Sequence, residues 1–466
     1  MSKKIKIITY LFTLVIIFFL ISVFLIGNEK MRSIKNMIPS NIKFFLKETI
    51  FVIPNLKSKN EILKKENNEL TDRIEKFNSS YPYLPLNKKI KIKSQNSESI
   101  ISASFYLLPK KNYKKYGSKP SGYIKKYNDL NILITGKGDF YYINDDSNYV
   151  SLNKIENNFL NYMKEKKSNE IFDFNSAAGI RGFDIHNNKI YVSYNNNIKN
   201  CYNTQIASSN FNLNYLNFDD FFIYEDCITK KEKTKNKVNE FEIQQSGGAI
   251  KVIEGNKILF SIGEYRKREL AQDPDSLFGK IIEIDINNPK IYTSKSMGHR
   301  NPQSLEYIND NNNNFIISTE HGPDGGDEIN INNLLGKENI TNFGWPISSY
   351  GYHYDRKERE KAPLHKSHTK FGFTEPLLSF GPPSIGISEI LNIESQENYV
   401  FLIGGMREKS IHVIEIKNNL KDIVNSDHYN FGERIRSITY DNNSKTFWAI
   451  SDDGPSIIKF NILKNN

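Results

Sequence analysis

A recurring strand unit constrains the fold of this chain more than any other feature. Six segments repeat a turn followed by an apolar run: NILITGKG from Asn131, NKIYVSY from Asn188, NKILFSIGE from Asn256, NNFIISTEHG from Asn313, NYVFLIGG from Asn398 and KTFWAISDDG from Lys445. Their spacing of roughly 45 to 85 residues suits four-stranded blades with insertions, so we predict an all-β, six-bladed β-propeller. Several copies end at Gly or an acidic residue, as expected of innermost strands that deliver their ends to a central site.

The N-terminal segment is apolar enough to cross a membrane. Residues 7–26 carry no charge, and about 20 such residues span the hydrocarbon core as a helix. The following GNEKMRS lacks the small residues of a cleavage site, so an uncleaved anchor is favoured over a cleaved signal peptide. We predict a single-pass transmembrane anchor over residues 1–30, with the rest of the chain on the periplasmic or extracytoplasmic side; the flanking charges favour this orientation only weakly.

A helical stalk is predicted over residues 31–89, followed by the propeller over residues 90–466. Leu56, Leu63, Leu70 and Phe77 recur every seven residues, which is heptad spacing. Two interpretations stay open, because three heptads make a short seam. The stalk forms either a parallel coiled coil that makes a homodimer, or a solvated single helix.

Charge and cysteine content exclude some functions. The formal net charge is +10, but the basic residues are spread along the chain, so no nucleic-acid partner is expected. A basic surface does suit an anionic ligand or an anionic membrane face. Cys201 and Cys227 are the only cysteines, and the chain has no Cys/His spacing typical of zinc or iron–sulfur sites. A disulfide between them and two separate buried thiols are both compatible with the sequence.

A dense run of motifs carries a specific resemblance. The chain contains GHRNPQ from Gly298, EHGP from Glu320 with Asp-Glu shortly after it, and NFGWP from Asn342. Further matches are LAQDPDSLFGKIIEID, EPLLSFGPPSIGIS and GERIRSI. Together they resemble the glucose/sorbosone dehydrogenase family over roughly residues 170 to 460. The resemblance implies a six-bladed propeller that uses pyrroloquinoline quinone (PQQ) and calcium to oxidise a sugar or related alcohol.

The resemblance also implies cofactor-binding and metal-binding residues. Arg300, Asn301, Arg434 and Arg436 match positions that contact the quinone, and Arg407 falls where the family commonly has a lysine. Guanidinium groups suit a ligand with three carboxylates, because they bind carboxylates in a bidentate manner.

For the metal, the carbonyl groups of Gly322 and Pro323 match ligands of the calcium that bridges to the quinone. Asp327 and Glu328 match positions used at a structural calcium site. Oxygen ligands of this kind are those that calcium prefers. An acidic, glycine-rich turn without a metal is the alternative.

The position of the catalytic base departs from the family pattern. Family members have a histidine before the Gly-Gly pair, and here that residue is Gln245, whose amide cannot accept a proton at neutral pH. Arg181 stands near a position where the family tends to have glutamine, and Pro382 where an aromatic cover is expected. His299 and His321 are nearby in sequence as substitute bases, although both match the family in other roles.

Two functions follow from these observations, and the sequence leaves open whether the protein is an enzyme. The first is a membrane-anchored, PQQ-dependent oxidoreductase of a sugar or related alcohol. The second is a catalytically inactive, calcium-stabilised propeller that binds a saccharide or a protein partner, which Gln245 favours. The joint presence of the arginine and calcium motifs tips the balance toward the enzyme.

Overall fold

The chain divides into two compact units, Met1–Phe77 and Asn78–Asn466. The computed structural model describes residues 60–66, 83–108, 122–136, 138–146, 149–165, 179–198, 201–229, 241–310, 313–335, 340–352, 365–393, 398–452 and 456–463. In the first unit, residues 60–66 are helical and exposed. Within the described ranges no helix is long and apolar enough to cross a membrane. The predicted anchor lies outside these ranges, as does most of the predicted stalk, so both stay predictions.

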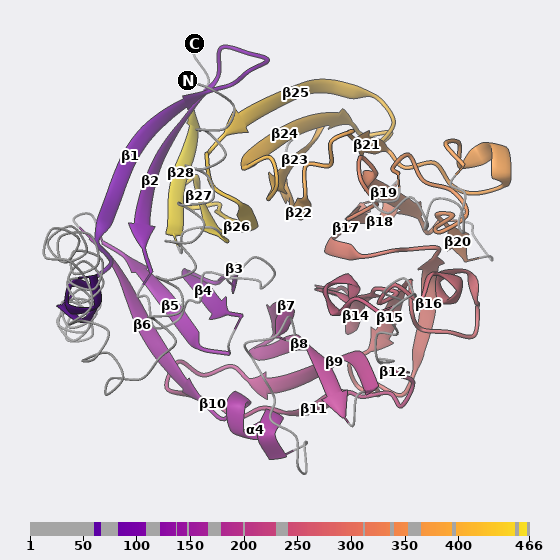
Figure 1. Cartoon of the computed structure of the whole chain (residues 1–466), viewed down its shortest axis with the longest axis horizontal. Helices are drawn as coiled ribbons and strands as arrows, with labels where there is room; N and C mark the ends of the chain where they lie inside the picture. The colour runs from indigo at the N-terminus through magenta and orange to yellow at the C-terminus, as the bar shows by residue number, and fades with distance from the viewer. Residues whose placement is uncertain are drawn as a thin grey trace, which may run out of the picture. The chain divides into compact units, whose positions relative to one another are not determined.

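The described residues of the second unit form six sheets (Figure 1). The first has the order β10 (Tyr215–Leu216), β6 (Val150–Asn157), β5 (Phe140–Asp145), β4 (Leu130–Thr135), β3 (Gly122–Tyr127). The second has the order β11 (Asp219–Phe222), β9 (Cys201–Asn210), β8 (Lys189–Ile198), β7 (Ile180–His186), with β12 (Ile228–Thr229) on β9. The third has the order β13 (Gly247–Ile253), β14 (Lys257–Ile262), β15 (Lys280–Asp285), β16 (Tyr292–Met297), β20 (Thr341–Asn342).

The remaining three sheets complete the ring. The fourth has the order β17 (Pro302–Asp310), β18 (Asn313–Glu320), β19 (Asp327–Asn333), β21 (Leu378–Phe380). The fifth has the order β22 (Ile387–Ile393), β23 (Asn398–Gly405), β24 (Ser410–Lys417), β25 (Ile423–Asn430). The sixth has the order β1 (Leu86–Lys93), β2 (Ile100–Leu107), β28 (Ser456–Leu463), β27 (Thr446–Ser451), β26 (Ile435–Asp441). Short helices α4 (Phe159–Glu165), η2 (Ile243–Gln245), η3 (Arg268–Gln272) and η4 (Thr369–Phe371) lie in the connections.

These sheets are the blades of a six-bladed propeller, which confirms the predicted fold. One strand of each blade faces the centre, and the successive inner strands β3, β7, β13, β17, β22 and β26 contact one another around a closed ring. The sixth blade joins both ends of this unit, because β2 pairs with β28 from Ile100↔Leu463 to Leu107↔Ser456. This pairing closes the ring with hydrogen bonds between strands at opposite ends of the propeller.

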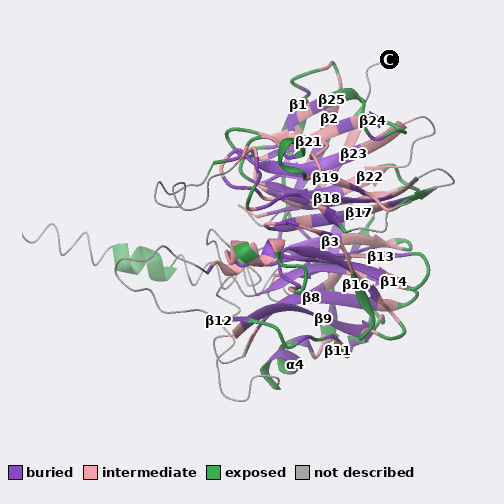
Figure 2. Cartoon of the chain, turned by 90° about the vertical axis from the view of Figure 1, so that its right-hand side faces the viewer, coloured by how far each residue is buried: buried purple, intermediate pink, exposed green. Residues whose placement is uncertain are grey.

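Packing between blades explains the sequence pattern. Six buried apolar clusters each combine residues of two neighbouring blades, for example Ile258 and Phe260 of β14 with Tyr191 and Ile206 of the preceding blade. The second strand of each blade, counted from the centre, is covered on both faces (Figure 2). Its sequence is therefore a continuous apolar run. Outer strands such as β1 and β25 are largely exposed.

Two details differ from the sequence predictions. The repeated segments are β4, β8, β14, β18, β23 and β27, which are the second strands of the blades and not the innermost ones. The sequence pattern revealed the second strands because they are buried on both faces and are therefore apolar throughout. The innermost strands also carry polar residues, because one edge faces the polar centre. The propeller also begins before residue 90, because β1 starts at Leu86.

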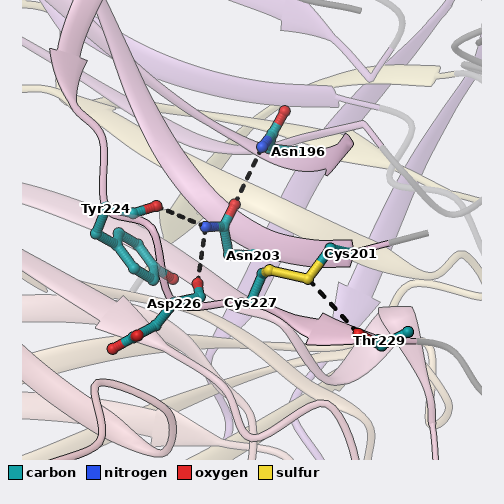
Figure 3. Close-up of a disulfide and its surroundings, with 7 residues drawn as sticks. All are labelled: Asn196, Cys201, Asn203, Tyr224, Asp226, Cys227 and Thr229. Atoms are coloured by element: carbon teal, nitrogen blue, oxygen red, sulfur yellow. Dashed lines mark hydrogen bonds between the residues drawn. A yellow bond between two sulfur atoms is a disulfide. The ribbon is translucent and has the colours of Figure 1, made fainter. Parts of the chain in front are cut away.

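The structure joins Cys201 and Cys227 in a disulfide, with the two Cα atoms 5.3 Å apart (Figure 3). The bond links the start of β9 to the segment before β12. The side-chain amide of Asn203 holds the same loop, because it donates to the carbonyl groups of Tyr224 and Asp226 at 2.9 Å each. Of the two interpretations of these cysteines, the structure has the disulfide.

Candidate active site

The candidate site lies on the face of the ring where inner strands begin and second strands end. Because the two strands are antiparallel, these ends meet in every blade; Gly247 of β13, for example, pairs with Ile262 of β14. Gln245 precedes β13, and Arg300 and Asn301 precede β17. His321 and Gly322 follow β18. The topology therefore brings residues from different blades to one end of the central channel.

Gln245 connects a carboxyl group to a guanidinium group. In the amide orientation that satisfies both neighbours, Nε2 of Gln245 donates to Oε1 of Glu264 at 2.8 Å, and its oxygen accepts from Nη2 of Arg300 at 2.8 Å. Backbone bonds fix the same arrangement, because Tyr265 N donates to Gln245 O at 2.9 Å and Glu264 N donates to Arg300 O at 3.1 Å. Gln245 is therefore held between the carboxyl group of Glu264 and the guanidinium group of Arg300.

Glu264 is a completely buried carboxyl group that we did not predict as a site residue. Its Oε2 accepts no hydrogen bond from the residues that the structure describes. Burial raises the pKa of this carboxyl to about 8, although the nearby guanidinium group of Arg300 opposes the shift. The signal in the sequence was the acidic residue that ends the third repeat, SIGE. At neutral pH most of this carboxyl is protonated.

Arg300 and Asn301 form hydrogen bonds to backbone groups on both sides of the candidate site. Nη1 of Arg300 donates to the carbonyl groups of His321 and Gly322 at 2.8 Å each, and its guanidinium lies 5.4 Å from the ring centre of Trp345. Oδ1 of Asn301 accepts from Gly247 N at 3.1 Å. The predicted pair thus lies at the centre of the candidate site and ties the third and fourth blades together.

Three arginines from different blades act electrostatically on His321. Burial and the guanidinium groups of Arg436, Arg300 and Arg181 lower the pKa of His321 to about 3, so the imidazole is neutral. Its Nε2 is buried and bonds to none of the described residues. Arg181 donates to the carbonyl groups of Gly247 and Gln244 at 3.2 and 3.1 Å. The positive charge of these guanidinium groups favours an anionic ligand in this region.

The other predicted arginines differ in position. Arg436 on β26 binds Oδ2 of Asp452 through Nε and Nη2, at 3.0 and 2.6 Å, and both side chains are largely buried. Arg434 donates through Nη1 to Met406 O at 3.4 Å. Arg407 has a side chain that is 53% exposed and pairs with Asp324 at 2.9 Å. Arg407 is therefore more exposed than Arg436, and it is not one of the three arginines that act on His321.

The two carbonyl groups predicted to bind the bridging calcium already accept hydrogen bonds in this structure. Gly322 O accepts from the cationic guanidinium of Arg300, which opposes a second cation at that oxygen. Pro323 O accepts from Gly326 N at 2.9 Å and from Ser384 Oγ at 3.1 Å. A metal at Gly322 O would have to compete with the guanidinium group of Arg300.

Asp327 and Glu328 are neighbours on β19 and so point to opposite faces of the strand. The Asp327 carboxylate accepts from the backbone N–H groups of Gly322, Gly386 and Ile387, at 3.3, 2.7 and 3.1 Å. Burial raises its pKa to about 6 despite these bonds. The carboxylate of Glu328 instead approaches Nε2 of His368 at 3.6 Å. Asp327 thus serves as a cap for backbone groups.

His299 does not provide a substitute base. Its Nδ1 bonds to Glu320 Oε2 at 2.8 Å and its Nε2 to Ser296 Oγ at 2.7 Å, so both ring nitrogens are already used inside the core. Glu320, also absent from the predicted site residues, in addition accepts from the backbone N of Arg300. These two residues position the segment that carries Arg300.

Comparison with known proteins assigns the family. Residues 179–459 match the family described as glucose / sorbosone dehydrogenase, and the chain belongs to this family. The aldose sugar dehydrogenase YliI of Escherichia coli (strain K12) is 32% identical over 211 residues, which cover 41% of this chain and 53% of that protein. An uncharacterized Synechocystis protein is 28% identical over 188 residues, which cover 37% of this chain and 42% of its own length. The chain spans about half the length of these curated relatives.

Solved structures share the fold. The soluble aldose sugar dehydrogenase from Escherichia coli in its apo form aligns with a TM-score of 0.56 and 18% identity, over 77% of this chain and 99% of that one. The PQQ-bound aldose sugar dehydrogenase from Streptomyces coelicolor aligns with a TM-score of 0.53 and 14% identity, over 78% and 98%. At this identity the likeness concerns the propeller alone.

Proposed function

We propose that this protein is a membrane-anchored oxidoreductase that oxidises a sugar or related alcohol with PQQ as its cofactor. The observation that carries the proposal is that Arg181, Arg300 and Arg436, from three different blades, all act electrostatically on His321, whose buried Nε2 bonds to none of the described residues. Membership of the glucose / sorbosone dehydrogenase family supports it. So do the names of the relatives, which include an aldose sugar dehydrogenase and a PQQ-bound one.

The residues of the site fit a tri-carboxylate quinone. Three guanidinium groups offer the charge that such a ligand needs, and Asn301 fixes the backbone of Gly247 between them. When bound, the quinone supplies a two-electron acceptor for the hydride that leaves the substrate carbon. The protein contributes binding, orientation and a place for the hydroxyl proton.

The proton acceptor that we propose is Glu264. It is the carboxyl that adjoins Gln245, and its Oε2 bonds to none of the described residues. A carboxylate with its pKa raised to about 8 is a stronger base than an ordinary glutamate, and Arg300 stabilises its charged form. Oε2 of Glu264 would take the hydroxyl proton of the substrate, and the bound cofactor would supply the acceptor for the hydride, so that the substrate would lose two electrons and two hydrogens in total.

The location belongs to the same proposal. A disulfide is rare in a reducing cytosol, and the pair Cys201–Cys227 therefore supports a propeller outside the cytoplasm. That side agrees with the predicted anchor over residues 1–30. The predicted homodimer through the stalk and the predicted calcium also remain proposals.

Calorimetric titration of the full-length chain in detergent with PQQ, with and without calcium, tests the cofactor. Stoichiometric binding followed by dye reduction with an aldose would support the enzyme, and a dependence of affinity on calcium would support the metal. Absence of PQQ binding under both conditions would refute the oxidoreductase proposal.

A second candidate is a catalytically inactive, calcium-stabilised propeller that binds a saccharide or a protein partner. Its specific support is Gln245, whose amide is held by two hydrogen bonds where the family has a base. This function predicts saccharide binding without dye reduction, even when PQQ is present. The substitution Gln245→His separates the two functions, as argued in the Discussion.

A further inference from the structure

A cluster of two histidines and one glutamate lies away from the candidate active site. Glu408 is in the turn between β23 and β24, His412 is on β24, and His428 is on β25. The register pairs His412 directly with His428, so both imidazoles project from the same face of the sheet. Their rings stack with centroids 4.5 Å apart and 20° between planes.

The metal-ligand atoms of the three side chains lie close together. Nε2 of His412 lies 2.8 Å from Oε2 of Glu408, and Nε2 of His428 lies 3.5 Å from the same oxygen. All three ligand atoms lie within 4.8 Å of one another. Ligands about 2.1 Å from a tetrahedral metal ion are about 3.4 Å apart, so the spacing suits a first-row divalent ion.

Neighbouring residues prepare the cluster for a cation. Nδ1 of His428 bonds to the side-chain oxygen of Gln95 at 2.6 Å, so this nitrogen carries the ring proton. In the neutral ring the buried Nε2 of His428 is then a lone pair; it makes no hydrogen bond to the described residues and lies 3.5 Å from Oε2 of Glu408. It faces a carboxylate oxygen, which is also an acceptor. Two acceptors that face each other need a cation between them. In addition, an imidazole that binds a metal typically donates its other N–H to a neighbouring group, as His428 does to Gln95.

His412 can satisfy its contact with Glu408 through its own Nε2–H, and a proton on Nε2 of His428 would satisfy the other contact. A metal ion in the same place would instead bind all three ligand atoms, which lie within 4.8 Å of one another. Ser410 Oγ also donates to Oε2 of Glu408 at 2.9 Å, which orients the carboxylate. The side chains of His412 and His428 are only 12% and 13% exposed, while that of Glu408 is 36% exposed and gives access from solvent. Imidazole ligands favour zinc, copper, nickel or iron over calcium.

We propose that Glu408, His412 and His428 bind one divalent transition-metal ion of the Zn²⁺ class. The position suggests a structural role, because Gln95 comes from the turn between β1 and β2 in the adjacent blade (Figure 1). Gln95 N also donates to His428 O at 2.9 Å. A metal here would fasten β24 and β25 beside the blade in which the two ends of the propeller meet. This site is independent of the proposed PQQ chemistry.

The test uses the full-length chain, purified in detergent without a histidine tag, stripped with EDTA and titrated calorimetrically with ZnCl₂. We expect one Zn²⁺ per chain and no displacement by excess Ca²⁺. His428→Ala and Glu408→Gln should each weaken binding at least 100-fold. Glu415→Gln is the matched control, since Glu415 is on the same strand but bonds to Asn398 instead; it should leave the affinity within twofold.

Two further measurements protect the test against misfolded variants. Gln95→Leu keeps all three ligands and should weaken Zn²⁺ binding about 10- to 100-fold, as loss of a partner of a ligating histidine does. Co²⁺ added to the stripped wild-type chain should give the visible absorption of a four- or five-coordinate ion. Absence of stoichiometric Zn²⁺ binding, or binding that survives unchanged in folded His428→Ala, would overturn the proposal.

Discussion

The side-chain amide of Gln245 donates to the carboxyl of Glu264 at 2.8 Å, and Glu264 is completely buried. This contact places a group that can take a proton directly beside the residue that replaces the family's histidine. Gln245→His would introduce an imidazole with Glu264 positioned to orient it.

We therefore expect Gln245→His to raise PQQ-dependent dye reduction by about 100-fold, the lower end of what a positioned base contributes. The control is Gln245→Asn, which should give no gain. An unchanged rate in a variant that still binds PQQ would show that the site lacks more than a base, and would favour the binding-only propeller.

Glu264→Gln should separate activity from stability. The pKa of Glu264 is raised from 4.5 to about 8, so the folded chain binds more protons than the unfolded chain between these pH values. The contribution of Glu264 to the free energy of unfolding is therefore largest below about pH 4.5, and it decreases as the pH rises to about 8. The melting temperature of Glu264→Gln relative to wild type should rise over the same range and then level off.

The rate should change in the opposite direction. Wild-type dye reduction should increase up to about pH 8 as the carboxylate forms, and Glu264→Gln should lose 10²- to 10⁴-fold. Melting curves and rates at pH 5 to 9 check both effects. A variant that is more stable at pH 8 but keeps full activity would exclude Glu264 as the proton acceptor.

The arginines divide into a buried group and an exposed one, which predicts unequal effects on the cofactor. Arg436→Gln removes the guanidinium group that binds Oδ2 of Asp452, so the site loses a cation. We expect PQQ affinity to fall by about 10- to 100-fold in calorimetry, as for loss of a charged hydrogen bond. Arg407→Gln removes an exposed ion pair with Asp324 and should change the PQQ affinity less than twofold. Equal losses would place Arg407 in the site.

Asp327→Ala tests whether this residue caps backbone groups or holds calcium. Because its oxygens accept from three backbone N–H groups, truncation should destabilise the propeller by about 2 to 4 kcal/mol. The loss should be the same with EDTA and with excess calcium in urea unfolding. If Asp327 is a calcium ligand, EDTA will destabilise the wild type and the difference between the two chains will shrink.

The propeller could be predicted from the sequence because one strand of each blade is buried on both faces and repeats six times. The same property hid the innermost strands, which line a polar centre. Arg300 and Asn301 were predicted as site residues from the motif run. Their contacts with Gln245 and Gly247 depend on which blades are adjacent, and no local pattern contains that information.

The remaining differences between the predicted and the observed sites come from strand boundaries and strand register. Asp327 and Glu328 look like a paired acidic turn, but β19 begins at Asp327 and strand geometry sends the two side chains to opposite faces. His412 and His428 are 16 residues apart and meet only because the β24–β25 register aligns them. A search for Cys/His ligand spacing could not find them, since the third ligand is a glutamate in a preceding turn.

The disulfide should stabilise the propeller measurably. Cys201 and Cys227 close a loop of 26 residues, and restricting such a loop in the unfolded chain contributes about 3 kcal/mol. The double variant Cys201→Ala/Cys227→Ala should lose about this amount in urea unfolding, and dithiothreitol should lower the wild type to the same midpoint. Asn203→Ala is the control, because it removes two hydrogen bonds to the same loop but keeps the covalent link. Its stability should still fall on reduction, whereas the double variant should be insensitive to dithiothreitol. A wild type that is equally stable with and without reductant would mean that the Asn203 contacts already hold the loop and that the covalent bond adds nothing.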